Sequence, residues 1–278
     1  MGNLIREVRH SLKHFYYRQL GHLSAETKEF TIKLDTSRAS NIREILDFKK
    51  RVNKGRWEKE FVQTCFDTIG KDETILEIGT WVGPFSVLFG KYLVPQGKVY
   101  SFEPDPVSFK NCLNNLVLNE VSNVFLFPVS ISDKVTTVPL YTNGMFGNSG
   151  SSIFQTTSFS ESDNQEMIEV PSTTIDKMVE ALGIEPTTIK MDIEGAENLA
   201  LKGGKKTIAK EGLKIFLEVH HEYLLKRGSN ANEIFKQLAD AGKSIYFLEN
   251  NKEYPFKFNE KLDPTKEINI NNFHILAM

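Results

Sequence analysis

The 278-residue sequence contains little cysteine, no long hydrophobic run and almost no net charge. Its two cysteines, Cys65 and Cys112, do not form a CxxC pair, so we expect two reduced, packed thiols rather than a disulfide framework. No apolar run approaches the ~18 residues that span a bilayer, and the N-terminus lacks the short apolar core of a secretory signal. The formal net charge of −2 provides no general positive field for nucleic acid. These absences favour a cytoplasmic protein whose partners do not include nucleic acid.

The hydrophobic content of 40% is sufficient for a large core, and its pattern indicates an α/β domain. Short, almost continuous apolar runs alternate with stretches of helical periodicity. Such runs are typical of parallel strands covered by helices on both faces, joined by right-handed crossovers. The strands are expected at 74–78, 98–102, 123–129, 187–191 and 213–219, and the helices at 84–93, 106–119, 173–182 and 196–209.

The C-terminal part departs from this alternation. A helix is expected at 229–241, followed by strands at 244–249 and 272–277 with no typical covering helix between them. Two successive strands without a crossover helix favour antiparallel pairing at the end of the sheet. A dehydrogenase-type sheet would stay parallel there, so this ending favours the methyltransferase variant of the doubly wound fold.

The N-terminal part, residues 1–54, is expected to be a helical extension of a domain that occupies residues 55–278. Residues 4–22 have the periodicity of a basic amphipathic helix, which either contacts a membrane surface or partner or simply packs on the main domain. A second helix is expected near 40–52.

A glycine-containing turn follows the first strand of the domain. Gly79 and Gly83 allow the backbone to turn sharply and approach a ligand, and Pro84 suits the first turn of a helix. In doubly wound sheets ligands bind at the carboxyl ends of the strands, where the strand order reverses. We expect this point at the first strand.

The residues of this turn favour S-adenosylmethionine over a dinucleotide. The spacing is GxxxG rather than GxGxxG, and Trp81 and Val82 would crowd a pyrophosphate. The methionine tail of S-adenosylmethionine is zwitterionic, and Glu77 supplies a carboxylate to anchor its ammonium group directly or through water.

Two further segments complete the expected cofactor site. Glu103, at the end of the second strand, is placed to accept hydrogen bonds from both ribose hydroxyls, while Asp105 is expected to cap the next helix. Ser130 and Ile131 follow the third strand and are expected at the adenine end. The complete expected set is Glu77, Gly79, Thr80, Gly83, Glu103, Pro104, Ser130, Ile131 and Asp192.

Five motifs lie in register within residues 55–220: GRWEKE (55–60), LEIGTWVGPFS (76–86), YSFEPDP (100–106), VPSTTID (170–176) and, most specifically, IKMDIEGAE (189–197). Together they resemble the FkbM family of methyltransferases. The resemblance implies a class I methyltransferase fold, with a mostly parallel seven-stranded sheet and an antiparallel C-terminal strand. It also implies S-adenosylmethionine as cofactor and O-methylation of a sugar, glycolipid or related small-molecule hydroxyl. Thr80 and Trp81 depart from the family, which tends to have small or polar residues there.

The candidate catalytic residues follow the fourth and fifth strands of the domain. Asp192 and Glu194 come after one strand, and His220 and His221 come after its neighbour. We expect Asp192 to orient His220, which would remove the proton of an acceptor hydroxyl. Glu194 and Glu197 have a second interpretation, because carboxylates also stabilise the start of a helix. A divalent metal held by these side chains is possible but not favoured.

The loop at 142–165 is long and rich in glycine and serine. Loops of this length are commonly lids or binding segments, and the alternative is a mobile surface loop. We expect it to close over the substrate, with Ser151 and Ser152 near the site because they match a serine pair of the family. His220 and His221 are also expected to face the acceptor. The alternative functions are N-methylation on the same scaffold and non-catalytic binding of a nucleotide or sugar.

Overall fold

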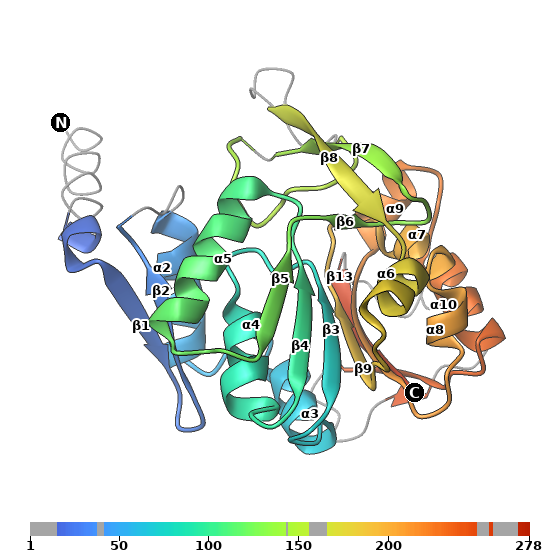
Figure 1. Ribbon diagram of the computed structural model, residues 1–278, viewed down its shortest axis with the longest axis horizontal. Helices are drawn as coiled ribbons and strands as arrows, with labels where there is room; N and C mark the ends of the chain where they lie inside the picture. Colours follow the sequence, from blue (N-terminus) through green and yellow to red (C-terminus); the bar gives the residue numbers. More distant parts are fainter. Residues whose placement is uncertain (1–15, 38–41, 143, 156–165, 249–255, 258–271) are drawn as a thin grey trace.

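The computed structural model describes residues 16–37, 42–142, 144–155, 166–248, 256–257 and 272–278. An eight-stranded sheet with the strand order β12-β11-β13-β10-β9-β3-β4-β5 forms the centre of the molecule (Figure 1). The strands from β10 to β5 are parallel, whereas β13 runs antiparallel to both β10 and β11. The seven strands and the antiparallel ending expected from the sequence are therefore present, and the short edge strand β12 is additional. The strands are β3 (Thr74–Ile78), β4 (Lys98–Phe102), β5 (Val124–Phe127), β9 (Thr188–Met191), β10 (Lys214–His220), β11 (Ile245–Phe247), β12 (Phe256–Lys257) and β13 (Asn272–Ala277).

Helices cover both faces of this sheet, which explains why the strands are apolar almost throughout. Alternate residues of one strand enter two different cores, since Ile75 packs in one apolar cluster and Leu76 in the other. One face carries α3 (Lys59–Thr68), α4 (Pro84–Val87) and α5 (Pro106–Leu118), and the other carries α6 (Ile175–Leu182), α7 (Glu197–Lys202), α8 (Lys205–Ile208) and α10 (Ala231–Asp240).

Two expected helices differ from the prediction. The helix expected at 84–93 is a short α-helical turn, α4, continued by a π-helix, η1 (Leu88–Leu93). The helix expected at 196–209 is broken into α7 and α8 at Gly203 and Gly204. A Cβ atom on Gly203 would lie 2.1 Å from the carbonyl oxygen of Ser132, so the chain passes too closely here for an ordinary side chain.

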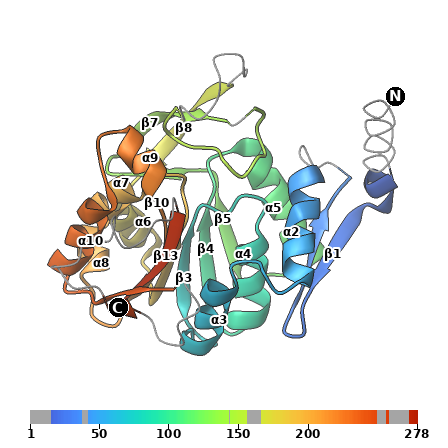
Figure 2. The ribbon, with the colours of Figure 1, turned by 180° about the vertical axis from the view of Figure 1, so that it is seen from behind.

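The N-terminal extension is not wholly helical, which corrects the prediction. Residues 22–35 form an antiparallel hairpin of β1 (His22–Glu26) and β2 (Thr31–Asp35), and the expected second helix is α2 (Ile42–Asn53). Side chains of α5 hold the hairpin, because Asn119 exchanges hydrogen bonds of 2.9 and 2.7 Å with the backbone of Lys33. Figure 2 shows α2 between the hairpin and α4.

Most of the amphipathic segment at 4–22 lies outside the described residues, so its two interpretations stay predictions. Among the helices of the described ranges, none is both long and apolar enough to cross a membrane.

A small second sheet, not expected from the sequence, lies over the carboxyl edge of the main sheet (Figure 1). Its strand order is β6-β8-β7, formed by β6 (Ser130–Ile131), β7 (Thr136–Tyr141) and β8 (Met167–Thr173). Since β6 directly follows β5, this sheet begins where the cofactor site was expected. The glycine- and serine-rich loop connects β7 to β8.

Candidate functional site

A cavity of about 900 Å³ opens at the carboxyl edge of the main sheet. This is at the upper end of the ~300–1,000 Å³ that small-molecule sites occupy. Its walls come from the segments that follow β3, β4, β5 and β9, from α2 and the turn after it, and from the glycine- and serine-rich loop. In the sheet β3 has β4, the next strand along the chain, on one side and β9, a later strand, on the other. The strand order therefore reverses at β3, and the cavity lies at this point.

The glycine turn after β3 forms one wall of the cavity through Gly79, Thr80 and Trp81. Gly83, also expected to bind the cofactor, is not among the lining residues; a Cβ atom there would lie 2.5 Å from Cys112 Sγ, so this glycine lets the turn pack closely on α5. Gly79 and Gly83 both have φ near the left-handed region, at 83° and 84°. A Cβ atom on Gly79 would lie 1.8 Å from the carbonyl oxygen of Asp192, so only glycine lets the turn approach the segment after β9. Trp81 also has a positive φ, of 50°, which costs roughly 1–2 kcal/mol for a side chain that is not glycine.

Glu103 holds this strained turn and lines the cavity. Its Oε2 accepts hydrogen bonds from the backbone N–H of Trp81 (2.8 Å) and Thr80 (3.1 Å), and its Oε1 accepts one from Asp105 (2.9 Å). Burial, together with the charge of Asp105, raises the pKa of Glu103 to about 8. Gly79, Thr80, Pro104, Ser130 and Ile131 line the same cavity, so the structure brings these expected residues together with Glu103.

Glu77 does not line the cavity, unlike Glu103 and Asp192, the other two acidic residues of the predicted cofactor site. Side chains alternate along β3, so Ile78 faces the cavity while Glu77 points beneath the turn. Its Oε2 accepts hydrogen bonds from the hydroxyls of Ser86 (2.6 Å) and Ser101 (2.7 Å). Within the described residues, its buried Oε1 has no hydrogen-bond partner. The direct anchor predicted for the cofactor ammonium is therefore not supported, and any contact must pass through water or a neighbouring group.

Lys190 is a functional residue that the sequence analysis missed. It is 3% exposed, lines the cavity, and its Nζ donates to the backbone oxygen of Gly79 (3.1 Å) and to Asp192 Oδ2 (3.3 Å). Burial by itself would lower the pKa of Lys190, but the charges of Asp192, Glu77 and Glu58 raise it. A single charged residue in the otherwise uncharged strand 187–191 was the signal available in the sequence.

Replacing Lys190 by methionine is expected to destabilise the fold by about 3–5 kcal/mol, because the surrounding buried carboxylates would lose their cation. Urea unfolding measures this effect. The matched control is Lys177→Met, since Lys177 forms an ion pair of 2.9 Å with Glu180 on the surface, where no measurable change is expected. Equal unfolding midpoints for the two variants would contradict the role assigned to Lys190.

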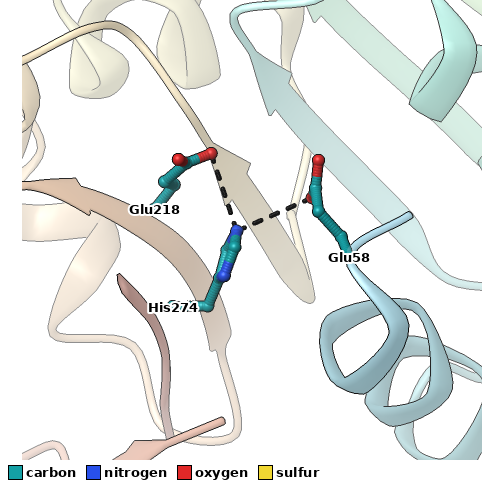
Figure 3. A group of neighbouring side chains, drawn as sticks. All are labelled: Glu58, Glu218 and His274. Atoms are coloured by element: carbon teal, nitrogen blue, oxygen red, sulfur yellow. Dashed lines mark ion pairs between the residues drawn. The ribbon is translucent and has the colours of Figure 1, made fainter. Parts of the chain in front are cut away.

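A second missed group stands on the same side of the cavity, at β10 and β13. His274 Nε2 lies 3.6 Å from Glu218 Oε2 and 3.7 Å from Glu58 Oε2, and all three residues line the cavity (Figure 3). Burial raises the pKa of Glu58 to about 7. Burial would also raise the pKa of Glu218, but its hydrogen bond with His274 and the nearby histidine charges lower it to about 2. Glu58 was visible only as part of GRWEKE, and His274 only as a polar residue in the last strand.

The residues Glu58, Glu218 and His274 have the side-chain types of a metal site, with ligand atoms within 4.8 Å of one another. The ammonium group of Lys190 already supplies positive charge to the carboxylates of Glu58 and Glu218. A divalent ion would have to compete with this cation. The cluster therefore does not fit a metal well, and we assign no step to one.

The predicted pair Asp192 and His220 is brought together, but not in the predicted role. His220 Nε2 lies 3.8 Å from Asp192 Oδ1, while its Nδ1 lies 2.9 Å from Glu197. Burial would lower the pKa of His220, but the charges of Glu194 and Glu197 raise it well above its ordinary value. A histidine held in the protonated state cannot accept a proton, and His220 does not line the cavity. The structure thus does not support His220 as the general base.

Some of the other residues predicted on the acceptor side line the cavity and others do not. Asp192 and Glu194 line the cavity, whereas His221 begins α9 (His221–Lys226) and is not among the lining residues. Glu197 is fully buried at the start of α7, where it accepts the Gly195 N–H (2.8 Å) as well as contacting His220. Glu197 therefore has a structural role, in line with the helix-start interpretation.

The described part of the loop, residues 144–155, lies along the cavity as expected. Ser151 Oγ donates to Asp105 Oδ2 (3.0 Å), and Ser152 Oγ donates to the backbone oxygen of Glu194 (2.9 Å). The indole N–H of Trp81 also donates to the Gly147 carbonyl (3.1 Å). Asp105 caps α5 as predicted and additionally holds the loop. Both serines thus line the cavity and tie the segments after β4 and β9 together.

Comparisons with known proteins were made against families, curated sequences and solved structures. The family described as "Methyltransferase FkbM domain" matches residues 77–245. A methyltransferase, sdnD, from Sordaria araneosa is 33% identical over 97 residues, which cover 34% of this chain and 37% of that protein. The match thus spans little more than a third of that relative.

Two solved structures are similar at low sequence identity. A methyltransferase FkbM from Methylobacillus flagellatus is 16% identical with a TM-score of 0.47, covering 86% of this chain and 54% of that one. A precorrin-6y C5,15-methyltransferase from Geobacter metallireducens is 13% identical with a TM-score of 0.45, and the match covers 79% of this chain and 88% of that one.

Proposed function

Because the chain belongs to the FkbM methyltransferase family, we propose that it transfers the methyl group of S-adenosylmethionine to a hydroxyl oxygen of a sugar, glycolipid or related small molecule. The observation that carries this proposal is the division of one cavity into two chemically different ends. One end is formed by the glycine turn and Glu103. The other adjoins the glycine turn, where Lys190 Nζ donates to the Gly79 oxygen, and is formed by Lys190 and the acidic and histidine side chains around it.

The first end suits the cofactor. The Glu103 carboxylate lies beside backbone groups of Thr80 and Trp81, with Pro104, Ser130 and Ile131 on the adjoining wall. We assign Glu103 to the ribose hydroxyls and Ser130 and Ile131 to the adenine end. The bound cofactor supplies an activated methyl group on a sulfonium, so the protein has mainly to align an acceptor oxygen with it.

The second end suits a hydroxyl acceptor, because an alcohol oxygen must lose its proton as the new bond forms. Asp192 lines this end with a partly exposed carboxylate whose Oδ2 is held by Lys190. We assign Asp192 to orient the acceptor hydroxyl and Glu58 to receive its proton. Glu58 would receive the O–H proton while the acceptor oxygen takes the methyl group that bound S-adenosylmethionine would supply, leaving the demethylated thioether.

Glu58 is a better proton acceptor than His220 for two reasons. It lines the cavity, and burial places its pKa at about 7, where a general base is effective at neutral pH. His274 of β13 lies 3.7 Å from Glu58 and is itself 3.6 Å from Glu218 of β10. Glu194 also lines the cavity, and we assign it to the same acidic wall without a proton-transfer role.

The proposal is tested by incubating the protein with methyl-labelled S-adenosylmethionine and fractionated cell extracts of glycans, lipids and small metabolites. The expected result is label in a product whose mass increases by one methylene unit and whose NMR spectrum contains a methoxy signal. A methylamine signal would instead identify N-methylation on the same scaffold. Calorimetry with S-adenosylmethionine but no transfer to any fraction would favour the non-catalytic alternative.

A further inference from the structure

Four cationic side chains line the outer part of the cavity. Lys50 and Arg51 lie in the last turn of α2, and Lys54 and Arg56 lie in the turn that follows. Backbone hydrogen bonds from Gly55 to Val52 (2.8 Å) and from Arg56 to Arg51 (2.9 Å) fold this turn back on the helix. The turn therefore brings cations from both sides of the helix end to one wall, which we call the basic rim.

The end of α2 explains only part of this arrangement. Cations in the last turn of a helix stabilise its negative end, which accounts for Lys50 and Arg51. Lys54 and Arg56 lie beyond the last helical residue, Asn53, so this explanation does not extend to them. Among the described residues, no ion pair within 4.0 Å and no side-chain hydrogen bond involves Lys50, Lys54 or Arg56.

The acidic residues near the basic rim do not neutralise it. Glu44 and Asp47 are the acids of α2 that line the cavity. Glu44 accepts the backbone N–H of Ser149 (3.1 Å), and the charge of Arg51 acts on it. Four positive and two negative side chains leave a net charge of about +2 at this wall, in a chain whose overall charge is −2. The inner end of the same cavity is acidic, so the two ends differ in sign.

We propose that the methyl acceptor carries a phosphate group, which binds at the basic rim through Lys50, Lys54 and Arg56 while an acceptor hydroxyl reaches Glu58. This inference rests on the proposed function. A phosphate monoester has a charge of about −1.5 to −2 near neutral pH, which matches the uncompensated charge of the rim better than a carboxylate does. Arginine and lysine are also the side chains best suited to phosphate oxygens.

The length of chain between the rim and Glu58 limits the size of this acceptor. Lys54 and Glu58 are four residues apart, so their Cα atoms are separated by at most about 14 Å. A phosphorylated sugar, free or as the headgroup of a lipid, spans such a distance. A long polymer would not be needed to reach both groups.

The test uses inorganic phosphate as probe, with the full chain saturated with S-adenosylmethionine and binding followed by phosphorus NMR. Saturable binding that weakens with added sodium chloride is expected. In the triple variant Lys50→Ser, Lys54→Ser, Arg56→Ser, phosphate affinity should fall by roughly ten-fold or more, as expected from the loss of hydrogen bonds to a charged group. The control variant Lys71→Ser, Lys98→Ser, Lys202→Ser removes the same charge from exposed positions outside the cavity and should bind as the parent does.

Three results of the anion-binding measurements would overturn the proposal, and a fourth would reassign the cations. They are no saturable phosphate binding by the parent, equal binding by the triple variant, and acetate binding as tight as phosphate, which would indicate a carboxylate acceptor. A parallel loss of S-adenosylmethionine affinity in the triple variant would assign the cations to the cofactor instead. Phosphate binding is measured without turnover, so its failure is distinguishable from failure of the methyl-transfer proposal.

Once an acceptor fraction is found, two comparisons separate its sources. Phosphatase treatment of that fraction should abolish methylation if the phosphate is a terminal monoester. Partition into organic solvent before the assay separates a lipid headgroup from a free sugar phosphate. The triple variant should raise KM for the active fraction while leaving kcat close to that of the parent, because the rim binds a part of the substrate that does not react.

Discussion

Replacing Glu58 by glutamine is expected to lower kcat by roughly 10²–10⁴-fold, the contribution of a positioned general base. Glutamine preserves the size of the side chain but cannot accept a proton. The affinity for S-adenosylmethionine should be unchanged, because Glu58 stands at the acceptor end of the cavity, by His274 and Glu218. Single-turnover methyl transfer and calorimetry measure the two quantities separately.

The pH dependence distinguishes a proton acceptor from a structural residue at this position. Only ionised Glu58 can receive a proton, and burial raises its pKa to about 7, so kcat should increase as the pH rises through 7. In the variant this rise should disappear. The matched control is Glu60→Gln, in the first turn of α3 and outside the cavity, which should keep the parent profile. An unchanged pH profile in Glu58→Gln, or a kcat in that variant equal to that of the parent, would contradict the assignment.

The contribution of Glu58 to the free energy of unfolding should fall as the pH rises, whereas kcat should increase. The folded protein holds the Glu58 proton up to a pH of about 7, whereas the unfolded chain releases it near the ordinary value of 4.5. The parent therefore loses stability from this group as the pH rises between these values. Glutamine removes that loss, so Glu58→Gln should be at least as stable as the parent at pH 8. A variant that is inactive because it is unfolded would fail this check in urea titrations.

Replacing Gly79 by alanine is expected to abolish measurable cofactor binding. The added Cβ would lie 1.8 Å from the carbonyl oxygen of Asp192, which is backbone and cannot rotate away. The turn and the segment after β9 would have to separate, which moves Thr80 and Glu103 away from each other as well. We expect an increase in the dissociation constant of S-adenosylmethionine of well over ten-fold, or about 1.4 kcal/mol for each factor of ten.

Gly212 provides the control for backbone strain. It also has a positive φ, of 73°, but no atom lies within 4 Å of the Cβ that alanine would add. Gly212→Ala should therefore lose roughly 1–2 kcal/mol of stability from strain and bind the cofactor normally. If Gly79→Ala bound S-adenosylmethionine as Gly212→Ala does, the close approach of the turn to β9 would not matter to the cofactor site.

The sequence determined the layers of this protein and the place of its site. Its apolar runs are buried on both faces, which only a helix-covered parallel sheet provides, and so strand positions and the antiparallel ending were predicted correctly. The glycine turn and Glu103 were predicted at this edge because each follows a strand whose carboxyl end must face it, whereas the serine pair was predicted from its match to the family. The FkbM resemblance, and with it the methyltransferase class, was carried by the same local segments and is confirmed by the family match.

Only the tertiary structure decided which charged side chains meet at the reacting end. Glu58 and His274 are more than 200 residues apart in the sequence, and they meet because β13 inserts beside β10 and the start of α3 lies across it. The sequence indicated no role for Lys190 and assigned Glu77 to the cofactor, because it does not show which face of the strand each side chain takes. The sequence placed His220 beside Asp192, but the carboxylates that raise its pKa come from two segments, Glu194 and Glu197 after β9 and Glu218 in β10. The local sequence pattern specifies the helices and strands. The protonation state of a side chain and its contacts depend instead on residues from distant segments, which only tertiary packing brings together.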